Sequence, residues 1–131
     1  MSIHRCGAFA ADPLAKHSNI KPMSTAKTPF IVLYCWRLHP GREAGFIAAW
    51  SRLTERLKER GSLGSRLHRG PDGLIYGYAQ WPSDEVRLAA FAENLDPDAS
   101  EYMSIAIAER FPELQLEPVA DYLEPLASRA G

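Results

Sequence analysis

The chain has 131 residues, of which 46% are hydrophobic and 24% are charged, and its formal net charge is −1. These values are ordinary for one globular domain, and the length is sufficient for a core of its own. The charge is uneven, because residues 1–29 carry four basic residues and one acidic residue, a net +3, whereas the rest carries 11 basic and 15 acidic residues, a net −4. A domain with this acidic balance and no basic stripe is not expected to have nucleic acid as its main partner. No apolar run approaches the roughly 20 residues that a membrane span needs.

The two cysteines, Cys6 and Cys35, form neither a CxxC pair nor a zinc-binding spacing. Cys35 lies inside an apolar run, where a buried free thiol is the ordinary interpretation. We therefore expect a reduced, cytoplasmic protein without a metal site.

Residues 1–28 show neither a helical nor a strand period and contain several prolines and serines. This pattern predicts a flexible N-terminal extension. Met23 precedes a natural start, so part of the first 22 residues could come from a mis-assigned translation start. We expect the folded domain to cover residues 29–127, with residues 128–131 as a C-terminal tail.

The longest apolar run, Phe30–Leu38, is rich in β-branched and aromatic residues and predicts a strand. Both of its faces are mostly apolar, so we expect both to be covered. A helix over residues 42–60 follows, in which four large apolar residues recur at steps of four, three and four on one face. These residues are Phe46, Trp50, Leu53 and Leu57.

Residues 65–69 and 74–81 predict two strands, which the Gly-Pro-Asp-Gly turn at residues 70–73 makes antiparallel. Gly77, inside the second of these strands, indicates a bend or the close approach of something bulky. Ser83 is the expected cap of a helix that reaches about Asn94, with residues 86, 89 and 90 facing inward and residue 91 left open.

Asp96 caps a further helix, with Pro97 in its first turn, which we expect to reach Arg110. A last strand is expected within residues 113–123. Pro118 places that strand at a sheet edge or at a bulge.

This order of elements predicts an α+β fold of the ferredoxin-like βαββαβ type, a four-stranded antiparallel sheet with helices on one face. The other face would expose apolar residues on a monomer. We therefore predict a homodimer in which two sheets meet through their open faces.

The sequence also resembles the antibiotic biosynthesis monooxygenase family, which forms a dimeric α+β barrel. The resemblance covers about residues 30–91. It rests on the apolar first strand ending at Pro40-Gly41, the helix with Phe46 and Trp50, residues 64–69, and the segment from Ala79 to Ser83 with its strand-ending Trp81.

The resemblance implies a choice of activities. The family includes oxygenases that use no cofactor and act on polyphenol-like aromatic compounds, haem-degrading enzymes, isomerase-like members and proteins without known activity. Haem degraders use an Asn of the first strand, near Tyr34 here, and a Trp and a His from the helical region after the third strand. Residues 82–111 contain neither Trp nor His, which argues against haem degradation.

A cofactor-free oxygenase needs a dry pocket for a flat substrate, a group that takes a proton, and donors that hold the resulting anion. The resemblance places Tyr34 and Trp36 on the pocket side of the first strand. The predicted pocket walls are Phe46, Trp50, Trp81, Phe91 and Met103, although aromatic core packing alone would also explain most of them.

His68 is the candidate base, because an imidazole titrates near neutral pH, and Arg66 shares its strand face and could hold an anion. The alternation of the same strand leaves a second interpretation open, in which Leu67 is the buried residue and His68 faces solvent or an interface. His39, in a turn, is interpreted as structural or exposed.

The sequence thus predicts a homodimeric, cofactor-independent monooxygenase-like enzyme for a small aromatic or quinol-like compound, with Tyr34 and His68 as catalytic candidates. The alternative is a protein of the same fold that binds a small ligand or a partner without catalysis. An enclosed cavity with a polar group converging on it would favour the enzyme, and a filled interface between helices and sheet would favour the alternative.

Overall fold

The computed structural model describes residues 28–124. Residues 28–118 form one compact unit, and residues 119–124 belong to a second unit. The expected N-terminal extension, the proposed start at Met23 and the C-terminal tail lie largely or wholly outside the described residues. Within the described part, no helix is long and apolar enough to cross a bilayer.

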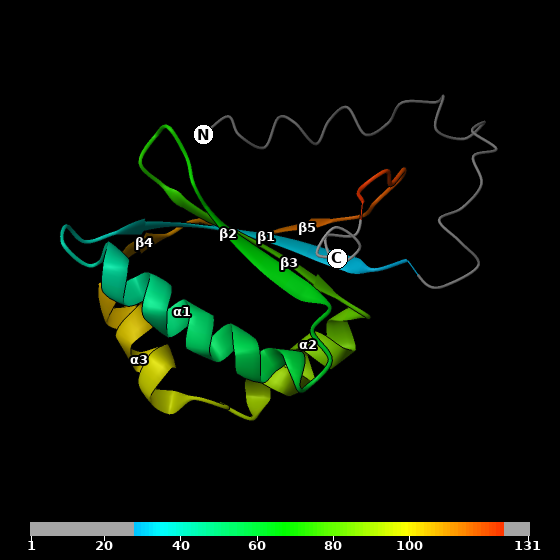
Figure 1. The fold of residues 1–131 in the computed structure, drawn as a ribbon, viewed down its shortest axis with the longest axis horizontal. Coiled ribbons are helices and arrows are strands. Elements are labelled where there is room, and N and C mark those ends of the chain that lie inside the picture. Colours follow the sequence, from blue (N-terminus) through cyan, green and yellow to red (C-terminus); the bar gives the residue numbers. More distant parts are fainter. Residues whose placement is uncertain (1–27, 125–131) are drawn as a thin grey trace. The chain divides into compact units, whose positions relative to one another are not determined.

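An antiparallel sheet forms one layer of this unit (Figure 1). The central strand β1 (Phe30–Leu38) pairs on one side with β3 (Ile75–Trp81), which in turn pairs with β2 (Gly64–Arg69). On its other side, β1 pairs with two short strands, β4 (Ile107–Arg110) and β5 (Leu114–Leu116). The order β2-β3-β1-β4 with β5 also on β1 is that of a ferredoxin-like α+β fold. The sheet is open rather than closed into a barrel.

Three helices cover one face of the sheet: α1 (Glu43–Lys58), α2 (Asp84–Ala92) and α3 (Pro97–Ala106). The predicted caps of the last two are confirmed. The Ser83 hydroxyl accepts a hydrogen bond from the Val86 N–H at 3.2 Å, and an Asp96 carboxylate oxygen accepts one from the Ala99 N–H at 3.1 Å. These contacts fix where each helix begins.

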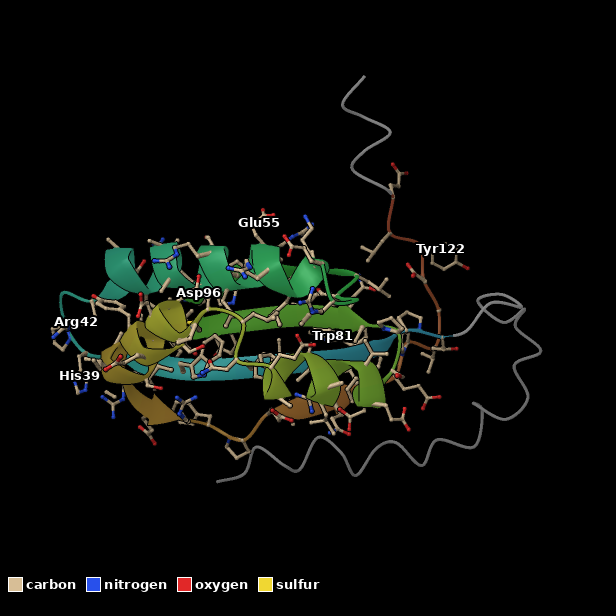
Figure 2. The ribbon with its side chains drawn as sticks, turned by 90° about the horizontal axis from the view of Figure 1, so that it is seen from below. His39, Arg42, Glu55, Trp81, Asp96 and Tyr122 are labelled. Atoms are coloured by element: carbon tan, nitrogen blue, oxygen red, sulfur yellow. The ribbon has the colours of Figure 1, made fainter. Side chains whose placement is uncertain are left out.

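Strand register determines which side chains meet the helices. Tyr34 pairs with Gly77, Trp36 with Ile75, and Phe30 with Trp81, so all six lie on one face. Trp81 and Ala79 pack with Leu57 of α1 and Ala90 of α2, which identifies this face as the helix-covered one. Figure 2, seen from the helix side, shows Trp81 between α1 and α2. We call the opposite face, with Leu33, Tyr76 and Tyr78, the open face.

The prediction of close approach at Gly77 is confirmed. A Cβ atom on Gly77 would lie 3.2 Å from the Trp36 ring, which is tighter than most such contacts and would require the ring to shift slightly. The absent side chain therefore lets the Trp36 indole lie flat across the neighbouring strand.

One boundary prediction was wrong at the C-terminal end. The helix expected to reach Arg110 ends at Ala106, and residues 107–110 form β4. Its apolar spacing suits a helix, but pairing with Trp36–Leu38 of β1 prevails because those strand residues would otherwise lack a partner. The final strand, β5 (Leu114–Leu116), lies within the predicted range of 113–123.

Among the predicted inward residues of α2, Ala90 is buried but Ala89 is exposed. The other buried residue of the helix is Arg87, a charged side chain that the apolar pattern did not indicate. Arg87 contacts two residues that line a pocket between the helices and the sheet.

Candidate active site

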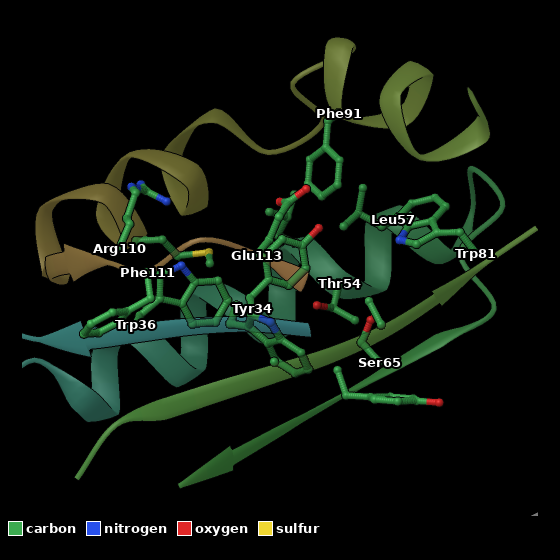
Figure 3. A pocket seen from close by; sticks show the side chains of 16 residues that line it. Tyr34, Trp36, Thr54, Leu57, Ser65, Trp81, Phe91, Arg110, Phe111 and Glu113 are labelled. Atoms are coloured by element: carbon green, nitrogen blue, oxygen red, sulfur yellow. The ribbon is translucent and has the colours of Figure 1, made fainter. Parts of the chain in front are cut away.

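A pocket of about 280 Å³ lies between the helix-covered face of the sheet and the helices (Figure 3). This volume is close to the lower end, about 300 Å³, of the usual range for small-molecule sites. The side chains around it come from all three helices, from the sheet and from the link between β4 and β5. They include Tyr34, Trp36, Trp50, Leu53, Thr54, Leu57, Ser65, Ala79, Trp81, Phe91, Met103, Arg110, Phe111 and Glu113.

Flat aromatic rings form the floor of the pocket. The rings of Tyr34 and Trp36 stack with their centroids 5.5 Å apart and their planes 6° from parallel. Phe46, fully buried, meets Trp36 edge-on, with ring centroids 5.3 Å apart. Phe91 packs on Trp81 at the other end, with centroids 6.0 Å apart. Such a surface suits a flat, apolar ligand.

One corner of the pocket is polar and is organised around Arg87, which is only 7% exposed. Its Nε donates to Asp84 at 2.9 Å, its Nη1 donates to the Tyr34 hydroxyl at 2.9 Å, and its Nη2 donates to Glu113 at 3.2 Å. Its guanidinium carbon also lies 5.6 Å from the centre of the Phe30 ring. A buried charge of this kind persists because each of its nitrogens has a partner.

The same contacts set the protonation states of the corner. Burial raises the pKa of Tyr34 above its usual value, and the hydrogen bond and charge of Arg87 offset only part of this rise. Burial alone would lower the pKa of Arg87, but its bonds to Tyr34 and Asp84 outweigh this and raise it. At neutral pH, Tyr34 is therefore a neutral hydroxyl and Arg87 a cation.

The Trp81 indole supplies a second polar feature. Trp81 is 1% exposed, and its Nε1 has no hydrogen-bond acceptor among the described residues. Figure 3 shows this nitrogen directed from the end of the pocket toward its interior. A buried N–H without a partner is uncommon and costs free energy, so it is a candidate donor to a bound molecule.

Comparison with known proteins identifies the fold. No family model and no curated protein matches the sequence. A structure from Chloroflexus aurantiacus, provisionally named an antibiotic biosynthesis monooxygenase, superimposes with a TM-score of 0.63 over 72% of this chain and 97% of that one, at 20% identity. The chain shares the fold of antibiotic biosynthesis monooxygenases.

Two further structures have this fold at lower identity. SnoaB from Streptomyces nogalater, named a cofactor-independent oxygenase, matches with a TM-score of 0.57 over 75% of this chain and 98% of SnoaB, at 15% identity. A dimeric ferredoxin-like protein from an uncultured marine organism matches with a TM-score of 0.58 over 80% of this chain and all of that one, at 12% identity. Identities this low establish the fold and leave activity to be argued from the site.

The structure brings most of the predicted site residues to the pocket. Six of them line it: Tyr34, Trp36, Trp50, Trp81, Phe91 and Met103. Phe46 instead lies in the core and packs against Trp36.

His68 and Arg66 lie elsewhere, and this corrects the expectation that they act at the pocket. His68 pairs with Tyr76 and Arg66 with Tyr78, on the open face. Leu67 packs against the core, as the second interpretation of this strand required. Within one subunit, the sheet itself therefore separates the imidazole from the pocket. His39 is exposed in the turn after β1.

Sequence reasoning missed Arg87 and Glu113. A lone basic residue one turn after Asp84, in a helix that is otherwise apolar in its middle, was a weak signal for a buried ion pair. Glu113 gave no signal, because it was counted as the start of an edge strand. Among the described residues, no group of three or more His, Cys, Asp or Glu side chains is placed to hold a metal ion.

Proposed function

We propose that this protein is a cofactor-independent, monooxygenase-like enzyme that acts on a small aromatic, quinol-like compound. The observation that carries the proposal is a pocket with aromatic walls and one polar corner, in which Arg87 holds the Tyr34 hydroxyl and the Glu113 carboxylate. This arrangement supports an enzyme over a filled interface, because a pocket is present between helices and sheet and polar groups converge on it.

The pocket would hold the substrate in a defined orientation. A planar ring system would lie against Tyr34 and Trp36, and the Trp81 N–H would donate to one of its oxygens. The Tyr34 oxygen accepts from Arg87, so its own hydrogen is left to donate to the substrate. Two hydrogen-bond donors held at fixed positions stabilise a substrate oxygen as it becomes negatively charged.

The overall reaction balances without an external reductant. A quinol and dioxygen give a hydroxyquinone and one water molecule, so the substrate supplies all the electrons. Loss of the hydroxyl proton would come first, because the anion transfers an electron to dioxygen more readily than the neutral quinol does. The shared fold of SnoaB, named a cofactor-independent oxygenase, supports this choice among activities.

We also propose that two copies pair through the open face. Leu114 and Leu116 of β5 lie beside Leu33 and Ile31 on that face and are 54% and 41% exposed. A second copy would cover them, and the dimeric ferredoxin-like protein of the same fold supports this assembly. Light scattering should report about twice 14.6 kDa. A 14.6 kDa particle at micromolar concentration would contradict the dimer.

Oxygen uptake with a panel of quinols and hydroxynaphthalenes tests the activity. We expect turnover above a heat-inactivated control for at least one two- or three-ring compound, with a hydroxyquinone as the product from a quinol and a quinone as the product from a hydroxynaphthalene. Tyr34→Phe should lower kcat about 10- to 100-fold, since one donor to the developing anion is lost. Tyr76→Phe, on the open face and outside the residues that line the pocket, is the matched control and should retain activity. Absence of turnover across the panel would contradict the proposed activity.

A further inference from the structure

We propose that Glu113 accepts the hydroxyl proton of the substrate, and that Arg87 is a positioning residue that holds Glu113 beside Tyr34. This inference deepens the proposed function and rests on it for the class of substrate, a neutral phenolic compound. It assigns the proton acceptor to a residue of the link between β4 and β5, in place of His68.

The interrupted edge of the sheet explains how Glu113 reaches the pocket. β4 and β5 both pair with β1, but residues 111–113 between them do not continue the ladder. The Phe111 N–H still donates to the Cys35 carbonyl at 3.0 Å, so the link stays close to β1. An interruption of this kind redirects a side chain that a regular strand would place elsewhere, and such irregularities are frequent beside active sites.

The geometry places an acceptor beside a donor. Nη1 and Nη2 of Arg87 are bonded to the same carbon, and they contact the Tyr34 hydroxyl and Glu113 Oε2 respectively. The two oxygen groups therefore lie side by side, and Figure 3 shows them near the middle of the pocket. One phenolic oxygen can then lie within reach of both, donating its hydrogen to Glu113 and accepting the hydrogen of Tyr34.

Glu113 is the suitable acceptor among the described residues that line the pocket. It is the acidic residue of that lining, and Arg87 contacts only its Oε2, which leaves Oε1 for a ligand. Tyr34 is neutral, because burial raises its pKa. The imidazole of His68 lies on the other face of the sheet.

Arg87 is already paired with two carboxylates, Asp84 and Glu113, and it is not among the residues that line the pocket. All three of its nitrogens already donate to Asp84, Tyr34 and Glu113. We therefore expect the pocket to favour neutral hydroxyl compounds over carboxylates of the same shape. In the proton transfer, the substrate O–H bond breaks, the proton moves to Oε1 of Glu113, and the electron pair remains on the substrate oxygen, which the Tyr34 hydroxyl stabilises.

The test compares the affinities of 1-naphthol and 1-methoxynaphthalene by calorimetry, since the methyl ether has no proton to give. Hydrogen bonds to a charged acceptor contribute enough to make the wild type bind 1-naphthol about tenfold or more tightly than the ether. Glu113→Gln should reduce this preference to about threefold or less. Asp84→Asn removes the other carboxylate on Arg87, which does not line the pocket, and should retain most of the preference. Glu85→Gln, an exposed neighbour, is the unchanged control.

The outcomes separate this inference from the proposed activity. A preference for naphthol that Glu113→Gln removes would support Glu113 even if no quinol is turned over, in which case only the activity would be contradicted. Equal affinity of the wild type for both probes, or equal losses in Glu113→Gln and Asp84→Asn, would overturn the assignment even if turnover is found. Failure of both probes to bind would overturn the pocket assignment together with it. Where turnover is measurable, Glu113→Gln should lower kcat with little change in KM.

Discussion

The two faces of the sheet are built from the same strands but differ in their polar chemistry. On the helix-covered face, Arg87 is 8% exposed at its side chain and has three partners. On the open face, Arg37 pairs with Glu109 at 2.9 Å, and both side chains are about half exposed, at 52% and 47%. Both are arginine–carboxylate contacts of ordinary length, but only the first is shielded from water. Burial, rather than the presence of an ion pair, therefore marks the face where chemistry is expected.

Removing each arginine should give the largest contrast between the faces. Arg87→Met leaves Asp84, Glu113 and the Tyr34 hydroxyl without their shared partner, so we expect a loss of about 3 kcal/mol in the free energy of unfolding. Arg37→Met removes an exposed pair and should cost less than about 1 kcal/mol. Urea unfolding followed by circular dichroism measures both. Similar losses would show that Arg87 is no more important than a surface arginine.

A bulkier residue on strand β3 should distinguish the faces next. Gly77→Val places atoms against the Trp36 ring, where a Cβ alone would already lie at 3.2 Å. We expect a loss of about 1–3 kcal/mol in stability and at least tenfold weaker binding of 1-naphthol. Gln80→Val, on the open face of the same strand, should change stability by less than about 0.5 kcal/mol. Normal binding by the Gly77 variant would place the ligand away from Trp36.

The smallest effect concerns two tyrosines whose pKa values are raised for different reasons. Burial is the main cause for Tyr34, whereas at Tyr76 a 2.6 Å hydrogen bond to Asp72 raises the pKa to about 12. Since both folded-state values lie above the unfolded value of about 10, the stability they contribute is complete below pH 10 and falls as pH rises.

Phenolate absorbance during an alkaline titration measures this difference. Asp72→Asn should return the Tyr76 transition toward the usual tyrosine range and leave the Tyr34 transition in place. Tyr34→Phe and Tyr76→Phe assign the two transitions. If Asp72→Asn shifted the transitions of both tyrosines, their raised pKa values would not have separate causes.

The local elements were largely predictable from sequence. Phe30–Leu38 was predicted with the bounds that β1 has, because its run of β-branched and aromatic residues is unambiguous. Ser83 and Asp96 were recognised as caps because capping depends on residues three apart. Positions decided by distant partners were less accessible. The end of α3 depends on pairing with β1, about 70 residues earlier in the chain.

The site was harder to predict than the fold for the same reason. Tyr34 and Trp81 were found because they lie on strands whose alternation assigns their face. Arg87 was missed because its burial depends on Tyr34 and Glu113, which are 53 and 26 residues away in sequence. His68 was placed at the pocket because a strand read from sequence does not reveal which of two alternating sets faces the helices, and Leu67 occupies that position.

An NMR titration of the 15N-labelled protein with 1-naphthol tests most directly which face of the sheet holds the ligand, because it observes both faces at once. We expect the Trp81 indole N–H signal to shift downfield on binding, because this buried donor gains an acceptor. The amide signals of His68 and Arg66, on the open face, should stay in place. Shifts confined to the open face, with the Trp81 indole unchanged, would contradict the claim that the helix-covered face holds the ligand.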